Sequence, residues 1–577
     1  MSSNNIKAAL DRLEELKRRF GTSESRSVEK TLAQLAARRF TDAASLIRFH
    51  EILLFLRAYP HSPATLRQAE DLLDSFHQRV EHLQTAGAED LYALTEPEVS
   101  GIAGTSFSAL WGYDIVCHLN ARHPTRVEID WQDYEGAATL IAVLKILLPF
   151  FEDGAYVEYP VPYLKWLRAA KARGERDLAC LLRCFEHYDV SPKEKAALFE
   201  ALKIWVHWEL GNSQATRTKM RRRARRIFYH DRPLLGRRDV SLARELDDTS
   251  PLPLTKLSRV EGETLLALGR DTMTVRYREL HGFTYGDARR VIRVDAGRGV
   301  EFYIWGVPAR RRLPLLAYHS VLICKNGVPA GYSESLSLFE RSECGLNLFY
   351  TFRDGESAWI YARLLRLFRQ YLGVTVFSID PYQLGFKNEE GIASGAFWFY
   401  RKLGFRPIQA KLARLVLNEE RRIAARPGYR TPARALRQLA TGHLLYETPA
   451  AKHRGDWDGF HIRNIGLAIQ RRMVERFDGL EQKMRRACVS RVARVLGAQT
   501  NNWNDDERRA FSDLALVLDL IPDLSRWSHE ERQAVVRIVR AKAAAKELRY
   551  ARLLQRHSKL RARLIEIGST DYLSSAE

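Results

Sequence analysis

The central part of the chain contains residues with the types and spacing needed to bind an anion. The run LNLFYT (346–351) is predicted to form a strand, residues 352–358 a turn, and residues 359–371 a helix with one apolar stripe. The first backbone N–H groups of a helix have no intrahelical partners, so they can bind a phosphate. Gly355 lacks a Cβ where a ligand would approach, and Ser357 adds little bulk. The turn is therefore predicted to hold a phosphate or pyrophosphate.

A tyrosine on a second helix is the candidate proton donor. The run VTVFSI (374–379) is typical of a buried strand, and the helix beyond it carries Tyr400 and ends at Gly404. Tyr400 could protonate a leaving group near the turn. The alternative is that Tyr400 is a core aromatic residue like its neighbours Phe397 and Phe399. The spacing leaves both interpretations open.

Strands are also predicted before the turn. Residues 300–307 (VEFYIWGV) are rich in β-branched and aromatic residues, which favours a strand. Residues 319–325 and 328–338 flank Asn326-Gly327, and this dipeptide between apolar-alternating runs is a strong hairpin signal.

In this order, the hairpin, the turn and the second helix resemble the acyl-CoA-binding core of the GNAT N-acyltransferase superfamily. The run AFWFYRKLGF (396–405) is similar to the family pattern Ala-x-x-x-Tyr-x-x-x-Gly-Phe. Ala393 replaces the Asn that usually opens the pattern, and Asn388 lies nearby in a longer loop. The resemblance extends over residues 258–425 at most.

The family's phosphate-binding signature, Gln/Arg-x-x-Gly-x-Gly/Ala, is matched in part. Gly355 takes the place of its first glycine, and Ser357 stands at the second. Phe352 occupies the Gln/Arg position, with Arg353 displaced by one residue.

The resemblance implies a multidomain α protein with a central α/β domain: a mixed-sheet, GNAT-like acyl-CoA N-acyltransferase fold flanked by helical regions. It also implies acetyl-CoA or another acyl-CoA as cosubstrate, an amine as acceptor and no metal. Tyr400 would protonate the leaving thiolate, and Glu334 on the hairpin is the candidate base. The expected cofactor-binding residues are Phe349, Thr351, Arg353, Gly355, Glu356, Ser357 and Ala358.

Other functions remain open. The domain could be a catalytically inactive binding or scaffold protein, which the degenerate turn favours. An aminoacyl-tRNA-using transferase would explain the basic charge, but no second GNAT unit is visible. The polar insertion at residues 380–390 either shapes an acceptor pocket or is a surface loop.

A chain of 577 residues is too long to fold around a single hydrophobic core, so several domains are expected. Residues 1–250 are predicted to be mainly helical, as one region or as subdomains 1–95 and 96–250. The α/β domain spans 258–425, and a basic helical region spans 430–577. Within these, one helix is expected to carry Trp205 and Trp208, and 529–567 is expected to form a long basic rod.

The net charge of +21 attracts polyanions, although arginine-rich composition could also explain it. The densest basic run, from Arg217 to Arg226, is expected on a helix, and a second basic segment spans 530–563. Both are candidate contacts for nucleic acid or an acidic protein. The alternatives are a solvated linker helix or pairing with carboxylates elsewhere in the fold.

No secretory signal is visible at the N-terminus, and the six cysteines form no CxxC pair. The longest apolar run, 137–151, contains Lys145 and Pro149 and is predicted to be a buried helix. These features favour a cytoplasmic protein without a transmembrane segment.

Overall fold

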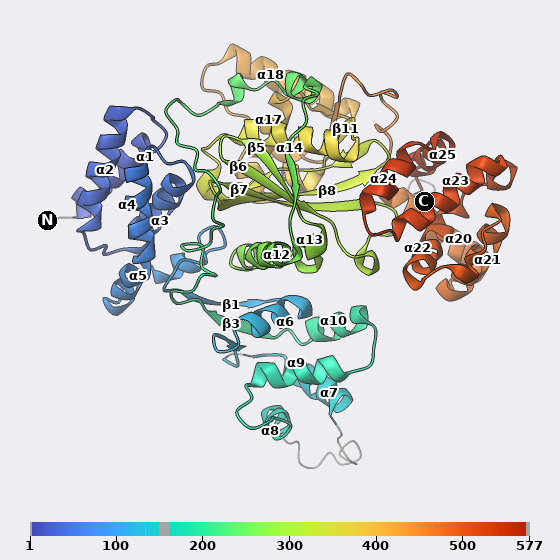
Figure 1. Cartoon of the computed structure of the whole chain (residues 1–577), viewed down its shortest axis with the longest axis horizontal. Helices are drawn as coiled ribbons and strands as arrows, with labels where there is room; N and C mark the ends of the chain where they lie inside the picture. Colours follow the sequence, from blue (N-terminus) through green and yellow to red (C-terminus); the bar gives the residue numbers. More distant parts are fainter. Residues whose placement is uncertain (1–2, 133, 149–161, 573–577) are drawn as a thin grey trace.

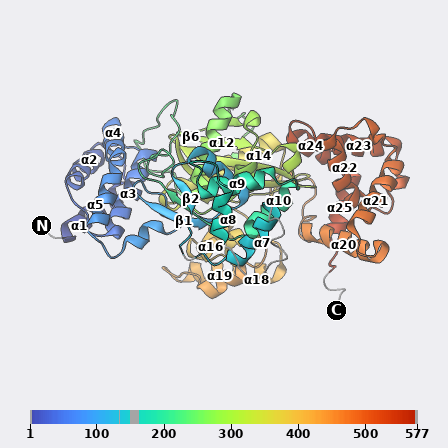
Figure 2. The same ribbon diagram turned by 90° about the horizontal axis from the view of Figure 1, so that it is seen from below.

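The computed structural model describes residues 3–132, 134–148 and 162–572. Figure 1 shows a central sheet between N-terminal helices on one side and C-terminal helices on the other, with a small α/β layer beside it. The view from below has the same order (Figure 2). The protein is thus a multidomain α/β protein with helical ends.

The N-terminal region is helical, as its apolar periodicity predicts. Its central helix, α3, is buried on nearly all sides because it packs between the other helices and the central sheet. Asp42 caps α3 by accepting the Ser45 N–H, and Ser62 caps the next helix with Pro63 in its first turn. The helices are α1 (Ser3–Leu16), α2 (Thr22–Ala36), α3 (Ala43–Ala58), α4 (Pro63–Asp74) and α5 (Phe76–Thr85).

A small antiparallel sheet follows, with strand order β1-β3-β2. Its strands are β1 (Ser106–Leu110), β2 (Val127–Ile129) and β3 (Trp205–Glu209). The helices around it are α6 (Tyr113–Arg122), α7 (Ala137–Leu147), α8 (Tyr163–Ala169), α9 (Asp177–His187) and α10 (Pro192–Ala201). Helix α11 (Leu242–Asp247) packs instead in the core of the central sheet. Helix α7 confirms the helix predicted for 137–151, whose last residues lie outside the described ones, but it is buried on one side only, and Ile146 is exposed.

The prediction of one helix through both tryptophans is wrong. Helix α10 ends at Ala201, and Lys203 has a positive φ of 50°. Trp205 and Trp208 then lie on strand β3, where Trp208 is buried and Trp205 is half exposed. The alternation of a strand, and not helical spacing, explains this difference in burial.

The central sheet has ten strands in the order β12-β13-β11-β9-β8-β7-β6-β5-β4, with β10 paired to β8. Neighbours are antiparallel except β9 and β11, which are parallel. The strands are β4 (Leu254–Lys256), β5 (Ile292–Gly297), β6 (Val300–Trp305), β7 (Ala317–Lys325), β8 (Val328–Leu338), β9 (Arg341–Glu343), β10 (Asn347–Leu348), β11 (Val376–Ile379), β12 (Arg406–Pro407) and β13 (Leu444–Glu447). The sheet therefore extends past residue 425, the expected end of the α/β domain.

The hairpin predicted at Asn326-Gly327 is confirmed. Both residues have positive φ, 49° and 80°, and they connect β7 to β8. Two positive φ angles match the twist of the strands, which is why Asn-Gly is favoured here.

Helices cover both faces of this sheet. On β6, Phe302 and Ile304 belong to the core that includes α14 (Ser357–Leu372), whereas Tyr303 and Trp305 pack on the side of α12 (Arg259–Thr274). This division follows from the alternating side chains of a strand. The remaining helices of the α/β part are α13 (His281–Tyr285), α15 (Pro381–Leu384), α16 (Glu389–Ala393), α17 (Ala396–Lys402), α18 (Ala410–Ala425) and α19 (Ala433–Leu439).

The basic run from Arg217 to Arg226 is not helical. It is an irregular segment whose arginines pair with carboxylates from other parts of the fold: Arg217 with Glu51, Arg221 with Glu70 and Arg222 with Glu261. The pairing alternative therefore explains much of this charge.

The long basic rod predicted at 529–567 is also wrong, because the chain turns twice. Three helices form instead, and α24 packs against β7 and β8. Arg561 pairs with Glu340 at the end of the hairpin, so some of this basic charge is also neutralised. The C-terminal helices are α20 (Ile462–Phe477), α21 (Glu481–Leu496), α22 (Asp505–Leu518), α23 (His529–Lys542), α24 (Glu547–Gln555) and α25 (Ser558–Ser569). Over the described residues, no helix has the length and apolarity needed to cross a membrane.

Candidate active site

The candidate site is a cavity of about 480 Å³ next to the point where the parallel strands β9 and β11 part. These strands are paired up to Cys344, whose N–H donates to the Ser378 carbonyl at 3.1 Å. The chain then leaves β11, and β10 pairs only with β8. The strand predicted at 346–351 is therefore only two residues long, and Tyr350–Phe352 form a 3-10 turn.

Tyr400 lies where the strands part. It projects from α17 and is 1% exposed, and its hydroxyl accepts the Leu346 N–H at 2.9 Å. Burial raises the pKa of Tyr400, so the phenol keeps its proton at neutral pH. Tyr361 and Phe405 pack against its ring, so Tyr400 is a core residue whose polar end lines the cavity. The core interpretation is thus confirmed, and the role of Tyr400 as a proton donor stays a prediction.

Glu334 lines the same cavity from β8. Its carboxylate accepts a hydrogen bond from the Tyr318 hydroxyl, and it has no ion-pair partner among the described residues. Burial raises the pKa of Glu334, which makes the carboxylate a stronger base. The two residues predicted to act as acid and base therefore lie on one cavity.

The predicted cofactor-binding residues divide into two groups. Phe349, Arg353 and Ser357 line the cavity. The other four do not, and each has an internal role; they are Thr351, Gly355, Glu356 and Ala358.

Gly355 serves packing instead of ligand approach. A Cβ at this position would collide with the hydroxyl of Tyr59, the residue that ends α3. The neighbouring Asp354 forms an ion pair with Lys17 at 3.7 Å. The N-terminal helices thus cover the turn at this point, and Gly355 does not line the cavity.

The side chains of the remaining three residues also have partners inside the protein. Thr351 hydrogen-bonds to Glu51, and Ala358 is part of the core under α14. Glu356 is fully buried and pairs with Arg298 and Lys325. The cavity therefore reaches this turn only at Arg353 and Ser357.

Sequence reasoning missed Arg276, which follows α12 and lines the cavity. It is 7% exposed, and its Cζ lies 3.8 Å from the centroid of the Phe349 ring. One guanidinium nitrogen donates to the Thr272 carbonyl at 2.7 Å, whereas Nε has no partner among the described residues. Burial and the nearby Arg217 lower the pKa of Arg276. A basic residue after a helix is ordinary in sequence, so only the burial makes this arginine distinctive.

A bridge of charges forms another wall of the cavity. Glu390 accepts from Arg278, at 3.2 Å, and from Arg353. Glu390 belongs to the insertion at 380–390, and Gln383 of the same insertion donates to the Leu346 carbonyl at 3.3 Å. The insertion therefore helps to form the cavity instead of a separate surface loop.

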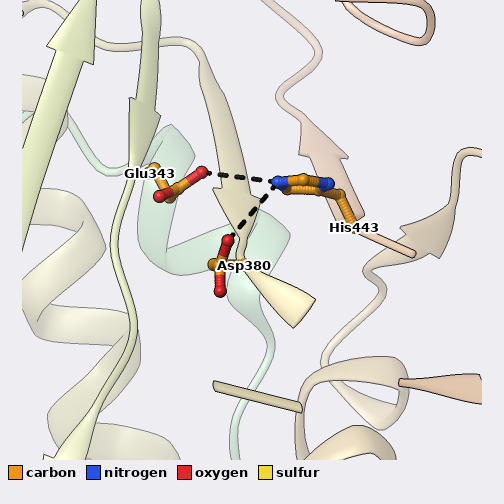
Figure 3. A group of neighbouring side chains, drawn as sticks. All are labelled: Glu343, Asp380 and His443. Carbon is orange, nitrogen blue, oxygen red and sulfur yellow. Dashed lines mark ion pairs between the residues drawn. The ribbon is translucent and has the colours of Figure 1, made fainter. Parts of the chain in front are cut away.

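A second cluster has the donors for a divalent cation (Figure 3). Nε2 of His443 lies 3.7 Å from a carboxylate oxygen of Glu343 and 3.7 Å from one of Asp380. Burial, Arg341 and other cations lower the pKa of His443 to about 4, which leaves its imidazole neutral.

These residues also have structural partners, however. Asp380 caps α15 through the Tyr382 N–H, and Arg341 lies 3.6 Å from Glu343. None of the three clustered residues lines the cavity. We therefore assign this cluster a structural role at the ends of β9, β11 and β13 and propose no activity for it.

Comparison with known protein families, curated proteins and solved structures finds no match for this chain. The residues that line the cavity therefore provide the basis for a functional proposal.

Proposed function

We propose that the protein is an acyl-CoA-dependent N-acyltransferase and that the cavity at the parting strands is its active site. The observation that carries this proposal is the hydrogen bond that the Leu346 N–H donates to the Tyr400 hydroxyl, in a cavity that Glu334 also lines. An acid that keeps its proton and a base of raised strength are the two groups that acyl transfer from a thioester to an amine requires.

The reaction would proceed as follows. Glu334 takes a proton from the ammonium of the acceptor, and the free amine attacks the thioester carbonyl carbon. A C–N bond forms, and the resulting oxyanion collapses as the C–S bond breaks. Tyr400 gives its proton to the leaving thiolate and regains one from the nitrogen of the tetrahedral intermediate, so the products are an amide and CoA.

A noncatalytic binding role is the second candidate. The covered turn at Gly355 favours it, since the N-terminal helices occupy the position where a pyrophosphate was expected. A ligand of that kind would then have to rely on Arg353 and Ser357. Binding of acyl-CoA separates the two candidates.

The test is calorimetric titration of the full chain with acetyl-CoA and with CoA. Ser394→Trp places a large ring at the exposed rim of the cavity, and Ala393→Trp is the matched control because Ala393 is exposed but outside the lining. We expect the wild type and the control to bind and Ser394→Trp to lose binding. No binding by the wild type would contradict the proposal, as would equal binding by all three proteins.

A further inference from the structure

The cavity contains one cation and one carboxylate that lack ion-pair partners among the described residues. The cation is Arg276, which faces the cavity above the Phe349 ring. The carboxylate is Glu334, whose hydrogen-bond partner is the neutral hydroxyl of Tyr318. Buried charges are normally paired, so an isolated charge of each sign in one cavity points to a ligand that supplies the partners.

The other charged side chains that line the cavity already form ion pairs with one another. Glu390 is shared by Arg278 and Arg353, and Arg353 also lies 3.8 Å from Glu98. Two cations therefore face two carboxylates on this wall. Arg276 is therefore the cation of the lining without a carboxylate partner among the described residues, and its single charge matches one carboxylate.

The geometry of Arg276 also suits a carboxylate. Its guanidinium lies against the Phe349 ring, and the bond to the Thr272 carbonyl orients one nitrogen away from the ligand. The Nε atom has no partner among the described residues but is itself buried, so a ligand would reach the terminal nitrogens of the guanidinium. A planar guanidinium presents two parallel N–H groups, which match the two oxygens of a carboxylate.

We propose that the amine acceptor carries a carboxylate, as an amino acid does, with Arg276 binding that carboxylate and Glu334 facing the amine. This inference rests on the proposed acyltransferase function. It narrows the acceptor to molecules with both groups, and it assigns Arg276 a role in substrate specificity.

The test uses N-acetylglycine, an analogue of such a product, and N-acetylglycinamide, which has the same shape without the charge. Thermal unfolding of the full chain is followed with each compound at matched ionic strength. We expect N-acetylglycine to raise the Tm of the wild type in a saturable way, with the amide bound roughly tenfold more weakly or worse.

Two variants make the test specific. Arg276→Met should remove the preference for the carboxylate compound, whereas Arg259→Met, at an exposed arginine outside the cavity, should keep it. Inorganic phosphate is the third probe. A saturable response to phosphate that needs Arg276, without one to N-acetylglycine, would assign the arginine to a phosphate and overturn the proposal.

The remaining outcomes separate this inference from the proposed function. If the protein binds acetyl-CoA but shows no carboxylate preference, only the acceptor assignment fails. If it prefers N-acetylglycine through Arg276 but binds no acetyl-CoA, the acyltransferase proposal fails and the acceptor assignment falls with it. An equal response in wild type and Arg276→Met would show that Arg276 is not the binding group.

Discussion

Two buried arginines, Arg217 and Arg276, illustrate two uses of the same side chain. Arg217 is 2% exposed, and one of its nitrogens lies 2.8 Å from each carboxylate oxygen of Glu51. Arg276 is nearly as buried, yet it has no carboxylate partner among the described residues. Arg217 joins the basic segment to α3 and to Thr351, whereas Arg276 faces a cavity.

The difference separates a charge that stabilises the fold from one that is available to a ligand. Removing one member of a buried pair leaves the other charge uncompensated, which is strongly destabilising. Removing a buried charge that has no partner relieves that cost instead. The same contrast holds for the two carboxylates, Glu51 and Glu334. Each of the following predictions tests it.

The largest effect is expected for Arg217→Met. Because Glu51 would be left buried without its cation, the free energy of unfolding should fall by about 3–5 kcal/mol. Urea denaturation measures it. Arg221→Met is the control, since its pair with Glu70 is much more exposed and should contribute about 0–1 kcal/mol. Similar losses in both variants would remove the distinction drawn for Arg217.

Glu334→Gln should have the next largest effect, on catalysis and not on the fold. We expect kcat/KM to fall about 100-fold, because a general base is lost. In the wild type, kcat/KM should decrease as the pH falls through the pKa of Glu334, which burial raises above its ordinary value of 4.5. This acidic limb should be absent from the pH profile of the variant. If the acidic limb persists in Glu334→Gln, a group other than Glu334 causes it.

The Glu51 pair also predicts an effect of pH on stability. Burial would raise the pKa of Glu51, but Arg217, His50 and Thr351 together hold it at about 2, below the ordinary value of 4.5. A depressed pKa contributes stability above about pH 4.5, which is lost as the pH falls towards 2. We expect a loss of roughly 2 kcal/mol over this range. Denaturant unfolding at each pH measures it, and Glu51→Gln should flatten this part of the curve.

The smallest effect on stability is expected for Arg276→Met. Without ligand, its free energy of unfolding should equal that of the wild type or exceed it by about 1 kcal/mol, since an uncompensated buried charge is replaced by an apolar side chain. The same denaturation series as for Arg217→Met provides the measurement. A loss comparable to that variant would show that Arg276 supports the fold, and the contrast between the two arginines would disappear.

Much of the local structure follows from the sequence because its causes are local. The Asn326-Gly327 turn, the Ser62 cap and the apolar stripe of α14 depend on residues a few positions apart. The predictions are wrong where a helical pattern was extended through a point at which the helix ends. Helix α10 stops before Trp205, and the basic segment at 529–567 turns twice.

The sequence by itself therefore determined the helical ends, the hairpin, and a turn followed by a helix with Tyr400 beyond it. It also provided Tyr400 and Glu334 as candidates, and both lie on one cavity. Only the tertiary structure decided that Tyr59 covers Gly355 and that Arg276 is buried with no carboxylate partner among the residues that the structure describes. The physical reason is that burial and pairing arise from contacts between distant segments, such as Glu51 with Arg217 and Thr351, which no local pattern encodes.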